Sequence, residues 1–294
     1  MTTNTVRTNH LNNSNEPLPL PFQAIGLASR TIGALFPGLF ARLMVHLFRT
    51  PIRTTAPKSR DIASAKQTMV PYDGGELAVY RWGNGPIVLL VHGWRAHAGR
   101  YRRMIPHLVE SGYQVVALDI PAHGNSSGKQ TDPYHTAEGI TAVMRNIGPL
   151  YAIVAHSFGA ASTAVLLSQK TIDLPNRVVL LGCPNQMTEI MASFANILGL
   201  PDRVFKSMLQ IIETATGAPM SDARTVQWVA PLEMPGLIVH DTQDEIVGYD
   251  SAKTIASGWA SAELLTTHGL GHSGILRDVN VINHVVEFLN QGKV

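Results

Sequence analysis

The sequence predicts an α/β protein in which helices cover both faces of a mostly parallel sheet. Uninterrupted apolar runs of strand length are typical of strands buried on both faces, and they recur at 86–91, 114–118, 151–155, 178–181 and 237–240. Helical patterns separate these runs, as the crossover connections of a parallel sheet require. One run stops just before Ser157 and a helix follows, which places a hydroxyl at the carboxyl edge of the predicted sheet.

The composition fits one soluble domain with additions. With 294 residues and 45% hydrophobic content, the chain is long enough to bury a substantial core. Its net charge of +2 is too small to indicate nucleic acid as a partner. The single cysteine, Cys183, excludes an internal disulfide, so we expect a buried, inert thiol in a reducing compartment, the cytoplasm. No zinc-ligand spacing or nucleotide-binding loop is present, so no metal and no cofactor are predicted.

The amino-terminal part divides into two segments before the domain begins. Residues 1–21 are rich in Asn and Thr with scattered prolines, a composition typical of a disordered tail. An apolar helical segment follows at 22–60, and we expect the α/β domain to occupy 61–294.

Large apolar side chains recur at helical spacing in the second segment: Ile32, Leu35, Phe36, Leu39, Phe40, Leu43 and Leu47. Arg30, Pro37 and Arg42 interrupt them, so no stretch of about 20 apolar residues is free to span a bilayer. Two interpretations of residues 22–51 stay open. Either they pack on the domain or pair two subunits, or they lie in a membrane interface with their arginines at the headgroups. Pro37 and Gly38 break the segment into two short helices, which favours packing.

A hairpin is expected before the parallel strands. Residues 70–75 contain Pro71 and two successive glycines, which predict a turn. Residues 76–82 alternate between polar and apolar side chains, which predicts a strand.

The segment 151–160 reads Tyr-Ala-Ile-Val-Ala-His-Ser-Phe-Gly-Ala and continues as a helix. A strand that turns so tightly into a helix forces its central residue, Ser157, into a strained conformation, so the residues two positions away must be small. The turn holds the hydroxyl at the amino end of a helix, where backbone N–H groups and the helix dipole favour a developing oxyanion. A hydrolase would place its nucleophile in such a position.

This turn resembles the nucleophile elbow of the α/β-hydrolase family, Gly-x-Ser-x-Gly, with Ala155 in place of the first glycine. The resemblance implies the α/β-hydrolase fold, a serine hydrolase activity like that of esterases and lipases, and partners in the chain order acid, then histidine. Serine at the elbow argues against the haloalkane dehalogenase and epoxide hydrolase branches, which need a carboxylate there.

Two later loops carry the partners that the resemblance implies. The loop after 237–240 matches the family's strand-x-Gly-x-x-Asp-x-x-Val pattern, which assigns the acid to Asp244, with Asp241 in the usual place of glycine. The loop after a predicted strand at 262–267 matches Gly-x-Gly-His, which assigns the base to His272. Both loops leave the carboxyl ends of strands, where ligand sites form in parallel sheets.

Neighbouring side chains compete for the same roles. Asp241 and Glu245 flank the favoured acid, and His268 precedes the favoured base by four residues. Asp241 lies nearer the strand end and is also suited to capping the loop or a helix.

The family's oxyanion hole takes one N–H from the residue after the nucleophile and one from the loop after an upstream strand. The run 86–91 ends at His92-Gly93-Trp94, so the resemblance assigns the donors to Phe158 and Trp94. The Trp94 side chain is then expected to overhang the acyl pocket, with a place in the core as the alternative.

A third match to the family lies at 119–126, Asp-Ile-Pro-Ala-His-Gly-Asn-Ser, close to the usual Asp-x-Pro-Gly-His-Gly-x-Ser. We interpret it as a structural loop in which His123 has no catalytic role. His156, beside the nucleophile, is likewise interpreted as a packed or hydrogen-bonded neighbour.

A basic cluster of Arg95, Arg100, Arg102 and Arg103 follows Trp94. We favour a solvated helix face for this cluster, with Arg95 as the best candidate for contact with substrate.

A long insertion at about 185–231 separates two of the predicted strands. It carries three helical runs: 187–198, 202–214 and 222–229. In this fold an insertion at this place covers the strand ends as a short helical cap. Most of its apolar side chains are expected to pack the cap, and a few to line an adaptable acyl pocket. The candidates for the pocket are Met187, Met191, Phe194 and Trp228.

The sequence therefore predicts a serine hydrolase that cleaves an acyl bond of a small molecule, in the first place a carboxylic ester of small to medium size. The same residues would serve a thioesterase, lactonase, amidase or carbon–carbon bond hydrolase, because the pocket selects the substrate. The alternative from another class is a non-catalytic ligand-binding protein on the same fold, which a complete Ser–Asp–His set disfavours.

Overall fold

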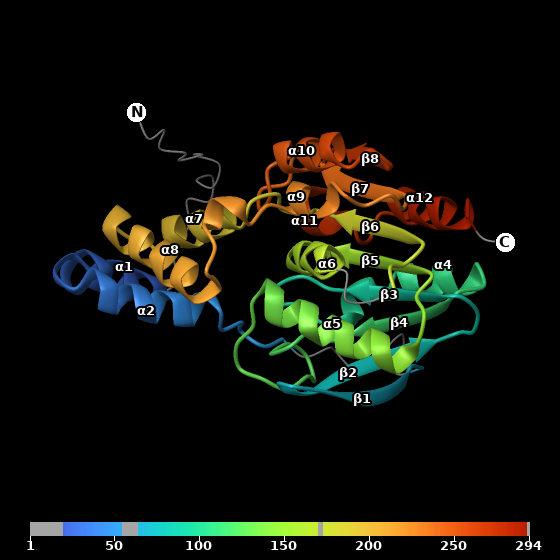
Figure 1. Ribbon diagram of the computed structural model, residues 1–294, viewed down its shortest axis with the longest axis horizontal. Coiled ribbons are helices and arrows are strands. Elements are labelled where there is room, and N and C mark those ends of the chain that lie inside the picture. Colours follow the sequence, from blue (N-terminus) through green and yellow to red (C-terminus); the bar gives the residue numbers. More distant parts are fainter. Residues whose placement is uncertain (1–19, 55–63, 170–172, 293–294) are drawn as a thin grey trace. The chain divides into compact units, whose positions relative to one another are not determined.

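The computed structural model describes residues 20–54, 64–169 and 173–292, and the larger part of it contains an eight-stranded sheet (Figure 1). In the order of the sheet the strands are β1 (Lys66–Tyr72), β2 (Gly75–Trp82), β4 (Gln114–Leu118), β3 (Ile87–Val91), β5 (Ala152–His156), β6 (Arg177–Leu181), β7 (Gly236–Asp241) and β8 (Ala262–Thr267). β2 is antiparallel to both of its neighbours, and every pair from β4 to β8 is parallel. The mostly parallel sheet predicted from the apolar runs is confirmed.

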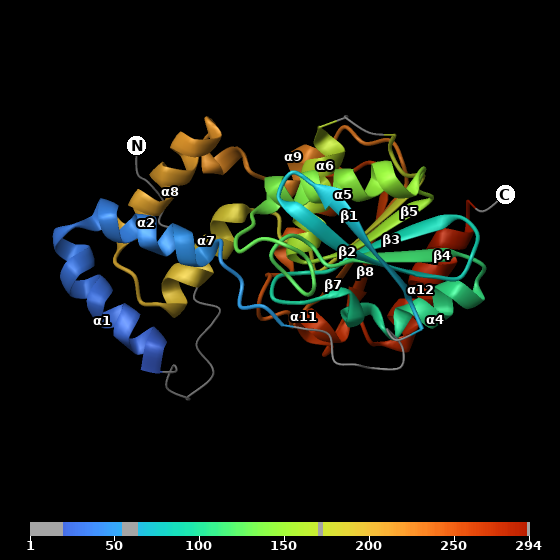
Figure 2. The ribbon, with the colours of Figure 1, turned by 90° about the horizontal axis from the view of Figure 1, so that it is seen from below.

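Helices cover both faces of the sheet, and Figure 2 shows α5, α6 and α9 on one side and α4 and α12 on the other. The first face packs against α5 (Pro133–Ile147), α6 (Phe158–Ser168), α9 (Thr225–Val229) and α10 (Asp250–Gly258). The second packs against η1 (Ala98–Tyr101), α4 (Met104–Glu110) and α12 (Val279–Asn290). On β3, Leu89 and Val91 point to the first core, and Val88 and Leu90 to the second. Burial on both faces explains the continuous apolar runs in the sequence.

The hairpin differs in extent from its prediction. The expected turn at 70–75 is shorter, because Val70 to Tyr72 continue β1 and only Asp73 and Gly74 lie between the two strands. The expected alternation in β2 is also incomplete. Residues 77–80 are all buried, because successive side chains enter the two cores in turn.

The strand register brings the functional loops to one edge of the sheet. β3 pairs Val91 with Ala155 of β5, and β7 pairs Asp241 with Thr267 of β8. Parallel strands that end together send their following loops to the same side. The loops after β3, β5, β7 and β8 therefore lie along the carboxyl edge.

Cys183 follows β6 and is completely buried. Its Sγ lies 3.9 Å from Thr225 Oγ1, and burial raises the pKa of the thiol to about 12. The expectation of a buried, inert thiol is confirmed.

The chain forms two compact units, of which the sheet unit comprises residues 49–185 and 224–294. The helical unit contains α1 (Leu20–Leu35), α2 (Pro37–Phe48), α7 (Met187–Ile197), α8 (Asp202–Thr216) and η2 (Met220–Asp222). The amino-terminal helices and the insertion helices, which we expected as separate parts, thus belong to one unit. α9, which we expected within the insertion, belongs to the sheet unit.

Within the helical unit, α2 contributes a buried face formed by Phe40, Ala41, Met44 and Val45. Gly33 of α1 lies against Phe40 and Val204 of α8, and an added Cβ would be 3.2 Å from Val204 Cγ2. α8 also buries Met208, and the rings of Phe48 and Phe194 meet edge to face at 5.2 Å. Packing between the first two helices and the insertion therefore forms the core of this unit.

The break into two amino-terminal helices predicted at Pro37 is confirmed. α1 begins at Leu20, two residues before the expected segment, and the rest of the tail expected at 1–21 lies outside the described residues, as do residues 55–60 of that segment. Within the part of the chain that the structure describes, no helix combines the length and apolar character needed to cross a membrane.

Candidate active site

Ser157 lies between β5 and α6 in a backbone conformation that residues with a side chain rarely adopt. Its φ is 52° and its ψ is −121°, and its N–H donates to the carbonyl oxygen of Leu181 at 2.9 Å. The turn leaves no room for a side chain at Gly159, where an added Cβ would overlap the carbonyl oxygen of His92. Ala155, on the other side of the serine, is fully buried, so the elbow accepts the extra methyl group.

His272 lies between Ser157 and Asp244. Its Nε2 is 2.9 Å from Ser157 Oγ, and its Nδ1 is 2.7 Å from Asp244 Oδ2. His272 belongs to the short helix α11 (Gly271–Gly274) after β8, and Asp244 to the loop after β7. The three side chains assigned by resemblance are thus within hydrogen-bond reach of one another at the carboxyl edge of the sheet.

The carboxylate of Asp244 is fully enclosed. Its Oδ1 accepts the N–H groups of Ile246 and Val247 at 2.8 and 2.9 Å, and its Oδ2 faces both His272 and His240, the latter at 3.3 Å. Burial by itself would raise the pKa of Asp244, but hydrogen bonds, first from His240 and then from His272, hold it well below its usual value. Asp244 is therefore ionised.

An ionised carboxylate only accepts hydrogen bonds, so the hydrogen between Asp244 and His272 lies on Nδ1 of the imidazole. In the neutral ring Nε2 then carries the lone pair and accepts the hydroxyl hydrogen of Ser157. This protonation state is the one that a general base for a serine nucleophile requires.

His240 is a neighbour of the acid that the sequence analysis did not single out. It is completely buried in β7, and its Nε2 lies 2.8 Å from the carbonyl oxygen of Val247 as well as 3.3 Å from Asp244 Oδ2. Both partners are acceptors, so Nε2 carries a hydrogen. The signal in the sequence is a histidine at the end of the apolar run Leu-Ile-Val-His, four residues before the acid.

Asp241, the first competitor for the acid, is used within its own loop. Its Oδ1 accepts the N–H of Gln243 at 2.9 Å, while its Oδ2 accepts the hydroxyl of Thr267 at 2.8 Å and the N–H of Leu270 at 2.9 Å. Burial would raise the pKa of Asp241, but these hydrogen bonds, led by that from Leu270, lower it. Asp241 thus joins the acid loop to the histidine loop, the capping role that we considered for it.

The other two competitors lie at the surface. The side chain of Glu245 is exposed. His268 is exposed as well, and its Nδ1 lies 2.8 Å from Thr242 Oγ1. Neither forms a described contact with Ser157.

The loop after β3 passes close to the elbow at Gly93. An added Cβ there would lie 3.0 Å from Nδ1 of His156 and 3.1 Å from Cβ of Ser157. Trp94 follows, and its ring lies 4.9 Å from that of Phe158, the first residue of α6. The N–H groups in the first turn of a helix have no partner within the helix. The two residues expected to form the oxyanion hole are therefore neighbours, and their role stays a prediction.

His123 holds the residue after Trp94 in place. Its Nε2 accepts the N–H of Arg95 at 3.0 Å, and its Nδ1 lies 2.9 Å from the carbonyl oxygen of Pro121, to which it donates. Arg95 has a φ of 54°, a left-handed conformation that needs such support. The interpretation of His123 as structural agrees with these contacts.

His92 makes a similar pair of hydrogen bonds, and its ring lies 5.4 Å from that of His123. Its Nε2 accepts the N–H of Ile120 at 3.1 Å, and its Nδ1 lies 2.8 Å from the carbonyl oxygen of Gly93. Each ring uses one nitrogen as acceptor and the other as donor, so both histidines are neutral. Burial lowers the pKa of His92 and of His123 to about 3.

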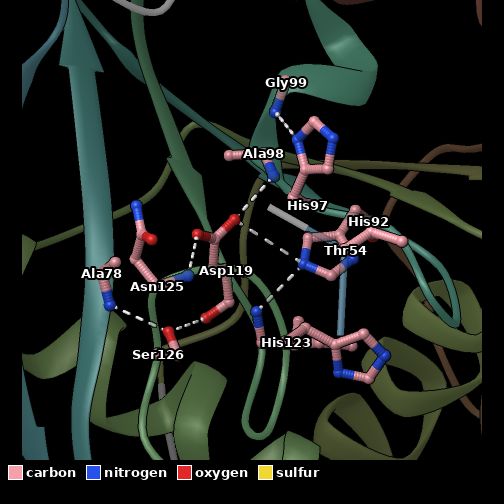
Figure 3. Close-up of polar contacts among 12 residues, drawn as sticks. Thr54, Ala78, His92, His97, Ala98, Gly99, Asp119, His123, Asn125 and Ser126 are labelled. Carbon is pink, nitrogen blue, oxygen red and sulfur yellow. Dashed lines mark hydrogen bonds and ion pairs between the residues drawn. The ribbon is translucent and has the colours of Figure 1, made fainter. Parts of the chain in front are cut away.

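Asp119 joins three segments beneath this loop, as Figure 3 shows. Its Oδ1 accepts the N–H of Ala98 at 2.7 Å, and its Oδ2 accepts the N–H of Asn125 at 2.8 Å. Ser126 donates its hydroxyl to the Asp119 carbonyl oxygen and accepts the N–H of Ala78. The family-like segment 119–126 is therefore a structural support.

The strap, which we define as residues 49–54, lies against the same loop. Arg53 donates from Nη1 to the carbonyl oxygens of Gly124 and Ser126 at 2.7 and 2.6 Å, and from Nη2 to that of Gly128 at 2.9 Å. The guanidinium group of Arg53 thus donates hydrogen bonds to several loop carbonyl groups that lack partners in a strand or helix.

Thr54, also in the strap, reaches the oxyanion loop itself. Its hydroxyl donates to the carbonyl oxygen of Arg95 at 2.8 Å. Because His123 takes the N–H of Arg95, the backbone directly after Trp94 is held at both of its polar groups. These contacts, which connect a loop to a segment about 40 residues earlier, were not predicted from the sequence.

His156 is packed between the elbow and the base. Its Nε2 lies 2.9 Å from the carbonyl oxygen of His272, to which it donates, and the two rings are 4.8 Å apart. Burial, together with the nearby His272 ring, lowers the pKa of His156 to about 3. It is the hydrogen-bonded neighbour that the sequence predicts.

The basic cluster separates into different surroundings. Arg102, Arg103 and Arg95 are exposed, as expected for a solvated face. Arg100 is partly buried instead, and its Nη2 donates to Ser273 Oγ at 3.0 Å. It therefore connects η1 to the loop that carries the base, and contact of Arg95 with substrate stays a prediction.

The remaining pocket candidates lie on two units. Met187, Met191 and Phe194 are on α7 in the helical unit, where Met191 is buried and Phe194 packs on Phe48. Trp228 is on α9 in the sheet unit and packs against the first core, and its ring and that of Tyr134 meet edge to face with centroids 6.5 Å apart. Their part in an acyl pocket stays a prediction.

Among the described residues, no group of three or more His, Cys, Asp or Glu side chains is placed to hold a metal ion.

A sheet of this strand order with a serine at such an elbow defines a class of hydrolases. A sequence profile of the Alpha/beta hydrolase family matches residues 88–283, well over half of the chain, and the protein belongs to this family. Its curated relatives include a protein named non-heme haloperoxidase from Rhodococcus erythropolis, 24% identical over 260 residues that cover 72% of this chain and 94% of that one. A human serine hydrolase-like protein is 29% identical over 157 residues, which cover 51% of this chain and 75% of that one.

Solved structures of esterases share the fold. The esterase Pf2001 of Pyrococcus furiosus superposes with a TM-score of 0.64 at 19% identity over 82% of this chain and 98% of that one. The esterase EaEST of Exiguobacterium antarcticum superposes with a TM-score of 0.61 at 16% identity, over 76% of this chain and 100% of that one. At these identities the likeness shows the fold alone, and it is the family match that indicates a hydrolase.

Proposed function

We propose that this protein is a serine hydrolase that cleaves carboxylic esters of small to medium size through an acyl-enzyme intermediate. The observation that carries the proposal is the position of His272, with Nε2 at 2.9 Å from Ser157 Oγ and Nδ1 at 2.7 Å from Asp244 Oδ2. The ionised state of Asp244 supports the tautomer that the reaction needs.

In the first step Ser157 Oγ attacks the ester carbonyl while its proton moves to Nε2 of His272. Asp244 stabilises the imidazolium that forms. The N–H groups of Trp94 and Phe158 receive the negative charge on the carbonyl oxygen. The imidazolium then protonates the alcohol, which leaves, and Ser157 carries the acyl group.

In the second step a water molecule attacks the acyl carbonyl, and His272 again accepts the proton. Collapse of the tetrahedral species returns the proton to Ser157 Oγ and releases the carboxylic acid. The same chemistry would hydrolyse thioesters, lactones, amides or activated carbon–carbon bonds. The residues that line the acyl side decide among these substrates.

A fluorophosphonate probe tests the nucleophile in the full chain. Mass spectrometry of tryptic peptides should place the label on Ser157, and Ser157→Ala should abolish both labelling and turnover. Only binding and the oxyanion hole would remain, worth roughly 10³–10⁴-fold over water. Ser168→Ala, a serine at the far end of α6, serves as the matched control and should keep full labelling. Undiminished esterase activity of Ser157→Ala would exclude the proposal.

A substrate panel tests the acyl class. p-Nitrophenyl esters of graded chain length should show kcat/KM values that fall for the longest chains, and thioesters and lactones should be poorer substrates. A higher kcat/KM for a thioester or lactone of equal length would replace the ester in this proposal.

A further inference from the structure

The helix pair α1–α2 leaves a set of large apolar side chains uncovered. Six of them are each between 50 and 76% exposed: Leu27, Ile32, Leu35, Phe36, Leu39 and Leu43. The opposite face of α2 is the one buried within the helical unit. Soluble proteins seldom leave so many large apolar side chains of two successive helices in water, and such a surface is typical of a binding site.

The charge of these helices indicates which partner. Every charged side chain on α1 and α2 is basic, and Arg30 and Arg42 are both exposed. No Asp or Glu occurs between Pro17 and Arg60. The other long helices of the same unit carry acids as well, Glu189 on α7 for example. Exposed apolar and purely cationic character therefore coincide on α1–α2.

We propose that this face binds the surface of a bilayer that contains anionic phospholipids. An interfacial helix buries leucine and phenylalanine at the boundary of headgroups and acyl chains, while arginines pair with phosphate groups. Leu39 and Leu43 lie one helical turn apart on α2, with exposed Arg42 beside them. The two helices have the composition of an interfacial element, and over the described residues neither is long and apolar enough to cross a membrane.

A second copy of the chain fits the same face less well. A two-fold symmetric contact places equivalent surfaces against each other. Arg30 and Arg42 of one copy would then approach the same cations of the other, and α1–α2 offer no carboxylate to neutralise them.

Co-sedimentation of the full chain with vesicles tests the proposal. The protein should bind vesicles of phosphatidylcholine and phosphatidylglycerol in equal parts far better than phosphatidylcholine alone, and about 0.5 M NaCl should weaken binding. Leu39→Ser with Leu43→Ser should lower the partition coefficient at least tenfold. Arg30→Gln with Arg42→Gln should lower it roughly fivefold for each arginine on anionic vesicles only.

The matched control is Leu174→Ser with Val279→Ser, two apolar side chains of the sheet unit that are 41 and 52% exposed. This variant should bind as the parent does. Every variant should melt at the same temperature as the parent when followed by circular dichroism. This control distinguishes loss of the binding surface from loss of folding. Failure of the full chain to bind anionic vesicles would overturn the proposal. So would a dimer in size-exclusion chromatography that the paired leucine substitutions dissociate.

Discussion

Asp241 and Asp244 lie three residues apart and carry the same functional group, but their carboxylates have different hydrogen-bond partners. Every described partner of the Asp241 carboxylate comes from its own loop or from β8 and the loop beyond it. Backbone groups occupy only one oxygen of Asp244, and the other faces two histidines. A carboxylate can orient a catalytic base only if one oxygen remains for it.

Asp244→Asn should therefore lower kcat by about 10³–10⁴-fold, because an amide no longer fixes the imidazole tautomer. Asp241→Asn should leave kcat within about tenfold and instead lower the free energy of unfolding by about 1–3 kcal/mol, since buried N–H groups lose an ionised acceptor. Steady-state kinetics and urea unfolding of the two variants separate these effects. A larger loss of kcat in Asp241→Asn would move the acid to that residue.

The loop after β3 depends on hydrogen bonds from residues outside it. Its residue Arg95 has a positive φ, and the partners of its N–H and carbonyl groups are His123 and Thr54. A loop in a strained conformation persists only when surrounding structure holds it. The oxyanion donor proposed at Trp94 immediately precedes this residue, so the strap is expected to influence catalysis from a distance.

Thr54→Val removes the hydroxyl and keeps the shape of the side chain. It should lower kcat by about two- to tenfold with little change in KM, which is the effect of losing one neutral hydrogen bond that positions an oxyanion donor. Thr54→Ser keeps the hydroxyl and should restore kcat.

Thr50→Val is the matched control for this prediction. Its hydroxyl accepts a hydrogen bond from Gln130, away from the oxyanion loop. An equal loss of kcat in Thr50→Val, or in Thr54→Ser, would mean that the strap acts only through stability.

The sequence predicted most of the sheet because burial on both faces leaves a direct mark, the continuous apolar run. It also placed Ser157, Asp244 and His272 correctly relative to strand ends, and parallel strands that end together then bring such loops to one edge. The hairpin was less well predicted, since Val70 to Tyr72 contain both turn-forming and strand-forming residues and only pairing with β2 decides between them.

Other features could not be predicted from the sequence, and the reason is physical. The contacts of Arg53 and Thr54 join side chains to carbonyl groups of a distant loop, and the orientation of those carbonyl groups depends on loop conformation. The packing of Gly33 on α8 is likewise a property of two helices about 170 residues apart. Local periodicity shows that a helix has an apolar face and does not say which partner covers it.

Three of the buried histidines make the whole fold sensitive to acid. His92, His123 and His156 each have a pKa lowered from 6.5 to about 3, in every case chiefly by burial. The unfolded chain therefore binds more protons than the folded chain between about pH 6.5 and pH 3. Stability is fully present above this window and is lost as the pH falls through it.

Urea unfolding in steps between about pH 7.5 and pH 4.5 should show a free energy of unfolding that falls with pH, by up to about 1.4 kcal/mol per pH unit for each such histidine. His156→Gln should reduce the slope of the free energy of unfolding against pH by the contribution of one histidine. His268→Gln, at an exposed histidine, is the control and should keep it. Equal stability at both ends of the range would contradict the neutral state of the buried rings.

The enclosed thiol of Cys183 makes this chain a convenient background for chemical labelling. Thiolate is the form that attacks maleimides, and a thiol with a pKa of about 12 supplies almost none at neutral pH. With no second cysteine in the sequence, an engineered one such as Leu43→Cys becomes the single reactive position. A spin label or an environment-sensitive dye can then be attached to α2 without first removing a native residue. Such a probe would report directly on whether α2 lies in water or in lipid.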